Sequence, residues 1–358
     1  MTCRVISANS AQEWSSAAGA DRPETFFSAE YHAMSERIWG GEGFVAVLER
    51  SGDRLIWPYI LQSIPGASGY WDINSAYGFA GPLPVMDSGG GSPFVEDALD
   101  HLMRVWREMS VVSVFTRFCP FHQNHLLFER WLETRPCEKG SVESNGHTVV
   151  IDATQTPVQR WPYYKGSLRR DIRRAEELSL RAEPDPDWER LEDFLTIYES
   201  VGERNEFALR HRLHREQFLT MRDRLGSKAA LFHVMDGDRV AASTVWVASG
   251  NVLHGLFGGP HPDYLRFGAY KFLIHCAVDW ARERGFRYLN VGGGRGGSDT
   301  DSLYQFKRAF SNLRLPFHIG RLILDAAKYN DLTVNRGLQT NTDFFPAYRA
   351  AGVVELEK

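Results

Sequence analysis

One lysine lies in an otherwise aromatic segment near the end of the chain. Lys307 follows Tyr304 and Phe306 and precedes Phe310, on a helix that we expect to begin near Asp301. A charge among aromatic rings needs a partner, which makes Lys307 a candidate catalytic residue and Tyr304 and Phe306 candidate substrate contacts. Spacing alone favours a different interpretation, in which Lys307 is a surface residue whose aliphatic stem covers the rings.

A glycine-rich segment with two acidic residues comes directly before this helix. Residues 292–297 read GGGRGG and follow a predicted strand, but neither a GxGxxG helix start nor a GK[ST] sequence comes after them. A Rossmann or P-loop nucleotide site is therefore not predicted, although such a turn permits close approach of the backbone to a substrate. Asp299 and Asp301 are either N-caps of the next helix or bases that take a proton from an amine.

A cationic helix is predicted over residues 165–180. Leu168, Ile172 and Ala175 mark its buried face. The opposite face can receive phosphate groups and comprises Lys165, Arg169, Arg170, Arg173 and Arg174. The alternative is a solvated helix face that is partly neutralised by Asp171, Glu176 and Glu177.

Four further polar residues lie at predicted strand ends or in loops, where an acceptor can bind. They are Tyr77, Arg204, His254 and Tyr264. The histidine pairs of the sequence have no acidic or cysteine ligand motif beside them, so no metal site is predicted. The four cysteines are far apart and form no CxxC pair, and no disulfide framework is expected.

The elements that position these residues occur twice. Two apolar strands, 44–48 and 54–61, are joined by a tight glycine-containing turn, and strands 229–235 and 239–248 repeat this pattern. Each hairpin is followed by a strand, a helix and a strand, which indicates duplication of one α/β unit.

We therefore predict an α/β fold with mixed sheets (α+β in character). The expected division is an N-terminal domain over residues 1–150, a C-terminal domain over 151–335 and a tail over 336–358. Residues 87–93 are expected to be a surface loop, because Gly, Ser and Pro dominate them.

The composition is that of a globular protein, and it excludes fibrous and disordered classes. The 358 residues are 43% hydrophobic, and the net charge of -4 combines -7 in residues 1–150 (11 Lys and Arg, 18 Asp and Glu) with +3 in 151–358 (30 against 27). The positive second half suits an anionic partner, although the chain as a whole lacks the basic pI of a dedicated nucleic-acid binder. We expect no membrane span and no signal peptide, and hence a cytoplasmic location.

Four stretches resemble the tandem Fem-type branch of the GNAT superfamily. They are YGFAGPL at 77–83, similar to a YGxxGP turn; SLRRDIRRAE at 167–176, similar to RxxIRxAxK; helix 267–285 with strand 288–291 and the triple glycine; and LYQFKRAF at 303–310, similar to a closing [FY]KxxF motif. This branch contains aminoacyltransferases that extend peptidoglycan cross-bridges and relatives that make amides in small-molecule biosynthesis. The resemblance implies two GNAT-like domains packed side by side over residues 40–320.

The resemblance also implies the chemistry of an amide-forming transferase. Such an enzyme moves an aminoacyl or acyl group from an activated donor to an amine, here of a cell-wall precursor or a small secondary metabolite. The reaction requires alignment of amine and carbonyl and stabilisation of the oxyanion, but no protein nucleophile. By resemblance, Lys307 stabilises developing negative charge or a donor phosphate, and the cationic helix contacts nucleic acid or an anionic acceptor.

Three interpretations of the function remain, two of which differ in the acyl donor. Aminoacyl-tRNA is the first choice, with no tightly bound cofactor, because the usual QxxGxG or RxxGxG acyl-CoA loop is not intact at residues 263–269 (DYLRFGA) and offers fewer N–H groups to a pyrophosphate. The alternative is an N-acyltransferase that uses acyl-CoA or an acyl-carrier-protein thioester, which the acidic overall charge favours. The third is an inactive GNAT scaffold that binds a partner through the cationic helix, and the intact Lys307 motif argues against it.

Overall fold

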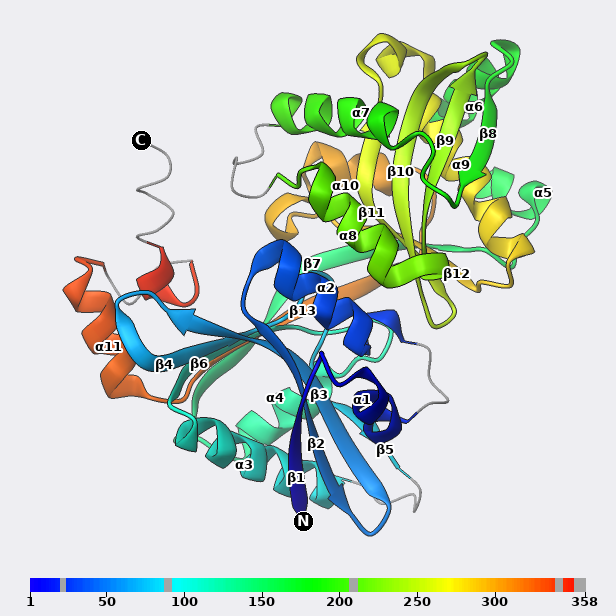
Figure 1. Cartoon of the computed structure of the whole chain (residues 1–358). Coiled ribbons are helices and arrows are strands. Elements are labelled where there is room, and N and C mark those ends of the chain that lie inside the picture. The colour runs from blue at the N-terminus through cyan, green and yellow to red at the C-terminus, as the bar shows by residue number, and fades with distance from the viewer. Residues whose placement is uncertain (20–23, 87–91, 206–211, 339–343, 351–358) are drawn as a thin grey trace. The chain divides into compact units, whose positions relative to one another are not determined.

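The computed structural model describes residues 1–19, 24–86, 92–205, 212–338 and 344–350, which form two compact units (Figure 1). Unit 1 contains the described residues up to Ser144, without Glu24 and Thr25, and those from Phe317 onward. Unit 2 contains Asn145–Pro316 together with Glu24 and Thr25. The chain passes from one unit to the other within strands β7 (Lys139–Asp152) and β13 (Arg314–Ile323).

Unit 1 is built on a mixed sheet ordered β1-β2-β3-β4-β6-β13, with β5 beside β3. Its pairs are antiparallel except β4 with β6, which is parallel. The predicted hairpin is confirmed: its turn uses Ser51 and Gly52, both at positive φ, as a tight two-residue turn requires. The strands are β1 (Thr2–Ser7), β2 (Glu42–Arg50), β3 (Asp53–Ile64), β4 (Ala67–Asn74), β5 (Leu83–Val85) and β6 (Val111–Arg117).

Unit 2 repeats this plan in the order β7-β12-β11-β10-β9-β8. Its parallel pair is β11 with β12, and the other pairs are antiparallel. The second predicted hairpin is confirmed as β9 and β10. The strands are β8 (Arg181–Asp185), β9 (Ala229–Asp236), β10 (Arg239–Ser249), β11 (Val252–Pro260) and β12 (Tyr288–Gly292).

The two units share one order of elements, which confirms the predicted duplication of an α/β unit with mixed sheets. A hairpin and a third antiparallel strand are followed by a helix, α3 or α9, and then by a strand parallel to the third. An antiparallel strand then closes each sheet, β13 in unit 1 and β7 in unit 2. The two compact units adjoin in the sequence at Ser144 and Asn145 and again at Pro316 and Phe317, whereas the sequence predicted boundaries at 150 and 335.

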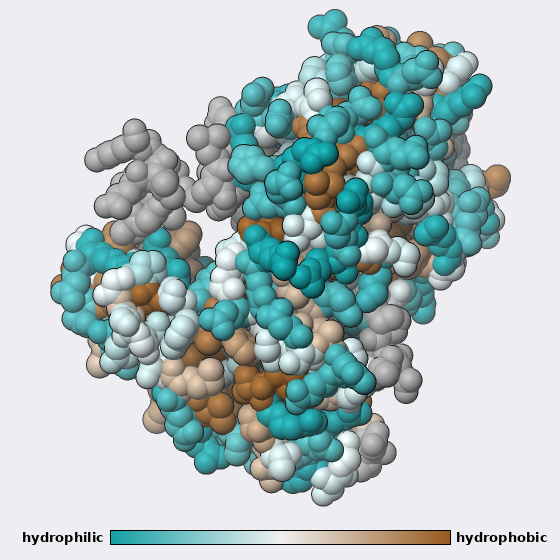
Figure 2. All heavy atoms as spheres, in the orientation of Figure 1, coloured by the Kyte–Doolittle hydropathy of each residue, from teal (hydrophilic) through white to brown (hydrophobic). Residues whose placement is uncertain are grey.

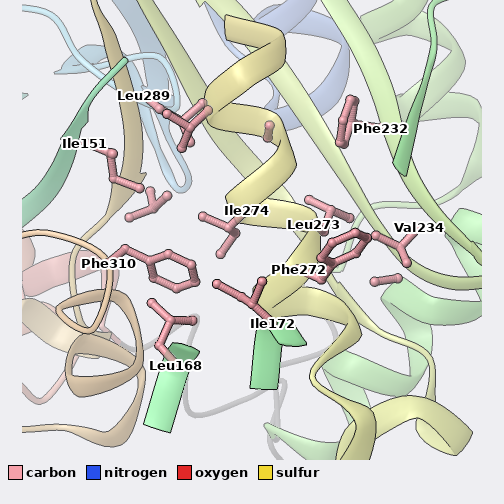
Figure 3. Packing of buried hydrophobic residues seen from close by; sticks show 14 of the residues in the cluster. Ile151, Leu168, Ile172, Phe232, Val234, Phe272, Leu273, Ile274, Leu289 and Phe310 are labelled. Carbon is pink, nitrogen blue, oxygen red and sulfur yellow. The ribbon is translucent and has the colours of Figure 1, made fainter. Parts of the chain in front are cut away.

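Helices cover both faces of the unit 2 sheet. Helices α6, α9 and α10 enclose a core that includes Ile172, Ile274 and Phe310 (Figure 3). Helices α7 and α8 cover the other face, where Tyr198 and Phe218 meet Phe257 of β11 edge to face. The helices are α5 (Pro157–Arg160), α6 (Gly166–Glu177), α7 (Leu191–Arg204), α8 (Arg215–Leu225), α9 (Ala269–Glu283) and α10 (Ser302–Lys307), with 3-10 turns η2 (Trp161–Tyr163), η4 (Gly226–Lys228), η5 (Pro262–Phe267) and η6 (Arg295–Gly297).

Unit 1 has its own core, in which Trp57 packs edge to face against Trp106 of α3 and Phe128 of α4. The visible surface of each unit is largely hydrophilic, with separate hydrophobic patches (Figure 2). None of the described helices is both long and apolar enough to cross a bilayer. The helices are α1 (Ala11–Ala18), α2 (Ala29–Trp39), α3 (Ser92–Glu108), α4 (His125–Glu133) and α11 (Ala326–Asn335), with 3-10 turns η1 (Thr25–Phe27) and η7 (Ala347–Arg349).

Two expectations about irregular segments need correction. Of the expected loop over 87–93, residues 87–91 lie outside the described residues, and Ser92 already begins α3. Of the expected tail over 336–358, residues 336–338 and 344–350 are described and belong to unit 1, whereas residues 339–343 and 351–358 lie outside the described part. Arg349 donates through Nε to Asp72 Oδ2 at 2.6 Å, and Asp72 also accepts from Ser113 and Tyr348. The segment closes unit 1 because its cation neutralises a carboxylate that is only 2% exposed.

We expect Arg349→Met to lower the free energy of unfolding by about 3 kcal/mol, because the substitution leaves the buried Asp72 carboxylate without its cation. Urea denaturation measures the change. The matched control is Arg4→Met, because the ion pair of Arg4 with Glu49 is exposed at both ends, and its effect should stay below about 1 kcal/mol. Equal effects of the two substitutions would contradict the assignment.

Candidate functional site

The two parallel strands of unit 2 pair over only three residues. Val252, Leu253 and His254 of β11 face Tyr288, Leu289 and Asn290 of β12. Strand β11 then continues to Pro260, and its residues 255–258 are half-buried where 252–254 are buried. Ligands of α/β sheets commonly bind outside the carboxyl ends of parallel strands. The end of this pairing therefore marks a candidate binding site.

A buried chain of polar groups lies at this point. Asn290 Nδ2 donates to His254 Nδ1 at 3.0 Å, while Asn290 Oδ1 accepts from Thr148 Oγ1 at 2.5 Å and from the Gly292 N–H at 2.9 Å. Burial lowers the pKa of His254 to about 3, so the imidazole is neutral and carries its proton on Nε2. These hydrogen bonds fix the backbone at the start of the turn that follows β12.

Lys307 extends from α10 to the same turn. Its Nζ donates to the Gly293 carbonyl oxygen at 2.7 Å, and the side chain is half-buried. Burial lowers the pKa of Lys307 to about 8, against the opposing effect of Asp301. The ammonium is therefore held by the protein next to the strand ends, and it is cationic below about pH 8.

The two predicted acidic residues have different tasks. Asp301 is the N-cap of α10: Oδ1 accepts from the Tyr304 N–H at 2.7 Å, and Oδ2 accepts from the Arg295 N–H at 2.9 Å. Burial works to raise the pKa of Asp301, but the hydrogen bonds from Tyr304 and Arg295 outweigh it and hold the pKa below its ordinary value. The cap interpretation of Asp301 therefore describes the structure.

Asp299 instead binds a histidine that the sequence did not single out. Its Oδ1 accepts from the His147 N–H at 3.0 Å, and its Oδ2 lies 2.5 Å from His147 Nδ1. The partners are 152 positions apart and meet because β7 pairs with β12. No spacing rule could have found this pair, because it exists only once the register of β7 is known.

The glycines of the turn permit close packing against β7. A Cβ on Gly293 would lie 2.7 Å from the carbonyl oxygen of His147, and one on Gly297, at φ 75°, would lie 2.5 Å from Asn145 Oδ1. The glycine-rich segment is thus explained by backbone contact within unit 2.

Three of the predicted substrate contacts, Tyr304, Phe306 and Tyr264, lie in unit 2 in different surroundings. Tyr304 is 1% exposed, and no described group bonds to its hydroxyl, while Phe306 stacks on Tyr270 with ring centroids 5.8 Å apart. Tyr264 is structural, because its hydroxyl donates to Asp236 at 2.7 Å.

Two other predicted contacts belong to other elements of the fold. Arg204 is exposed at the end of α7. Tyr77 lies in unit 1, where it stacks on Trp39 and its carbonyl accepts from Tyr31.

Ring and backbone contacts hold two of the five cations on the α6 face, and no described ion pair neutralises them. Arg173 lies over the Trp161 ring, and Arg174 lies over Phe267 and donates to the Arg266 carbonyl. Within the described chain, ion pairs are absent at three other cations of the face, Lys165, Arg169 and Arg170.

Helix α6 also packs on the N-terminus of α9. A Cβ on Gly268, the N-cap of α9, would lie 2.9 Å from Asp171 Cβ, and the Asp171 carboxylate pairs with Lys271 in the first turn of α9. A carboxylate already occupies the neighbourhood where this helix N-terminus would attract a phosphate. In the described residues, no group of three His, Cys, Asp or Glu is arranged to hold a metal ion.

The comparisons define the class of the chain. The family model described as an acetyltransferase (GNAT) domain matches residues 164–308, from just before α6 to just after Lys307. The protein therefore carries a GNAT acyltransferase domain. The strand plan of unit 1 makes the whole a tandem of two such folds, and the resemblance drawn from the sequence is confirmed.

Solved structures extend the likeness to nearly the whole chain. The crystal structure of FemX is similar with a TM-score of 0.68 and 14% identity, covering 92% of this chain and 99% of that one. A conserved protein of unknown function from Bacteroides thetaiotaomicron is similar with a TM-score of 0.59 and 12% identity, covering 90% of this chain and 99% of that one. The C-terminal domain of a putative lysylphosphatidylglycerol synthetase from Agrobacterium fabrum is similar with a TM-score of 0.54 and 13% identity, covering 90% of this chain and 93% of that one. At these identities the likeness establishes the fold. No curated protein matches the sequence.

We expect the Lys307 amine to titrate near pH 8, against 10.5 for an ordinary lysine, because burial disfavours its charged form. NMR of lysines labelled with carbon-13 at Cε measures this titration, and the signal is assigned by its loss in Lys307→Met. A midpoint above pH 10 for that signal would show that the amine is solvated.

Proposed function

We propose that this protein is an amide-forming transferase that moves an aminoacyl or acyl group from an activated ester or thioester to an amine. The observation that carries this proposal is the Lys307 ammonium, held on Gly293 at the end of the β11–β12 pairing inside the GNAT domain. Activated acyl donors are already electrophilic, so alignment and charge stabilisation are sufficient for transfer.

Lys307 supplies the charge stabilisation in this proposal. When the neutral amine attacks the carbonyl carbon, negative charge develops on the carbonyl oxygen, and a nearby ammonium of low solvation stabilises it strongly. The Tyr304 hydroxyl is buried without a hydrogen-bond partner among the described residues, so it is assigned no role in this step. His254 acts in the site as a neutral group, because its pKa is about 3.

Aminoacyl-tRNA remains the first-choice donor, with a cell-wall precursor or a small metabolite as the amine. Support comes from the exposed cations of α6, which can bind an RNA backbone, and from Asp171 beside the α9 N-terminus, which disfavours a pyrophosphate there. A cytoplasmic location, where tRNA is charged, belongs to the same proposal. An acyl-CoA or acyl-carrier-protein donor is the alternative, and an inactive binding scaffold is the third.

Lys307→Met should lower kcat/KM for transfer at least about tenfold, which corresponds to roughly 1.4 kcal/mol of transition-state stabilisation. The substitution removes the ammonium but keeps the length and apolar contacts of the stem. The control is Lys228→Met, at another half-buried lysine of unit 2, which should leave transfer unchanged. Near-normal transfer by Lys307→Met would refute the role of the ammonium.

A donor screen with charged tRNAs, acyl-CoAs and loaded carrier proteins, read by mass spectrometry, tests the donor. We expect transfer that RNase abolishes, and a loss of at least about tenfold in Arg169→Glu/Arg170→Glu, because charge reversal repels the RNA backbone. The matched control reverses two arginines of α8, the half-buried Arg222 and the exposed Arg224, as Arg222→Glu/Arg224→Glu. Transfer that survives RNase and requires a phosphopantetheine thioester would select the alternative donor. Binding without transfer would select the scaffold.

A further inference from the structure

The hydrogen bond between the His147 ring and Asp299 has a defined donor and acceptor. The Asp299 carboxylate accepts from the backbone N–H of His147 and faces its ring Nδ1. Nδ1 must therefore carry a proton toward the carboxylate, which leaves Nε2 of the neutral ring as an acceptor. Within the described residues, nothing bonds to Nε2, and 39% of the His147 side chain is exposed. The free nitrogen is thus available to a ligand.

Asp299 is poorly suited to be the base itself. Both of its oxygens are engaged by His147, and the backbone carbonyl of Asp299 accepts from Gln305 Nε2 at 3.1 Å, which ties the loop to α10. A carboxylate that orients an imidazole through Nδ1 is the standard means of fixing the tautomer and stabilising the imidazolium that forms. This arrangement makes Asp299 a positioning residue and moves the basic atom to His147.

His147 and Lys307 both contact the turn that follows β12, at Gly293. The Gly293 carbonyl accepts from Lys307 Nζ, and the peptide of Gly293 lies against the His147 carbonyl so closely that a Cβ would be 2.7 Å away. The charged side chains of β7, of the turn and of α10 are Lys139, Glu143, Asp152, Arg295, Asp299, Asp301 and Lys307. Arg295 is paired with Asp301, and Glu143 is paired with Arg321. The His147 imidazole of β7 is therefore oriented by a carboxylate, and among the described residues its Nε2 has no hydrogen-bond partner.

We propose that His147 is the general base of the transfer reaction, an inference that rests on the proposed function. The amine nitrogen forms a bond to the donor carbonyl carbon, and Nε2 of His147 takes one proton from that nitrogen. The carbon–oxygen or carbon–sulfur bond of the donor then breaks, its electron pair stays on the leaving atom, and the imidazolium returns the proton to it. The products are the amide and a free hydroxyl or thiol, and no other reactant is consumed.

The test compares His147→Ala with the parent protein, using whichever donor the screen identifies. We expect kcat to fall about 100-fold or more, as for loss of a general base, with KM within about threefold and melting temperature unchanged. Added imidazole should raise the rate of the His147→Ala variant at least about tenfold. His147→Gln decides the same question if the alanine variant does not fold. His261→Ala removes another histidine beside a carboxylate of unit 2 and should be neutral.

Asp299 is tested by its own pair of substitutions. Asp299→Asn should lower kcat strongly because the amide no longer fixes the tautomer, whereas Asp299→Glu should retain at least about tenfold more activity than Asp299→Asn. A purely structural role would show in the melting temperature and would not follow this order. Full activity of His147→Ala, or failure of imidazole to rescue it, overturns the inference while Lys307→Met still tests the proposed function. Absence of transfer by the parent protein overturns both.

Discussion

The candidate site depends on one backbone contact that leaves no room for a side chain. At Gly293 the peptide lies against the His147 carbonyl, and its own carbonyl accepts from Lys307. A glycine at this position lets three separate parts of the chain, β7, the turn after β12 and helix α10, meet at one point. The position of the ammonium follows from that contact, while the Asp299 carboxylate orients the imidazole.

Burial sets the charges around this contact. It lowers the pKa of His254 to about 3 and that of Lys307 to about 8, because charged forms are disfavoured away from water. The histidine is thereby held neutral, while the lysine keeps its charge at neutral pH at a cost in solvation. The same low solvation strengthens the interaction of the ammonium with any negative charge that develops beside it.

Local patterns predicted much of the fold and only part of the site. The hairpins followed from apolar runs joined by turns such as Ser51-Gly52, and α6 followed from Leu168, Ile172 and Ala175. His147 could not be found, because its partner Asp299 becomes a neighbour only through the register of β7 on β12. The folded end of unit 1 was missed for a similar reason: nothing near Arg349 in the sequence indicates a buried Asp72.

The closing strands also determine the order in which the chain can fold. Strand β6 of unit 1 finds its antiparallel neighbour only when β13 has been synthesised, after the whole of Asn145–Pro316. Until then its edge presents unpaired backbone groups, which are prone to pair with other chains. On the ribosome, unit 2 therefore completes its sheet first. A chain cut at residue 316 would retain the residues of the candidate site but lack the last strand of unit 1.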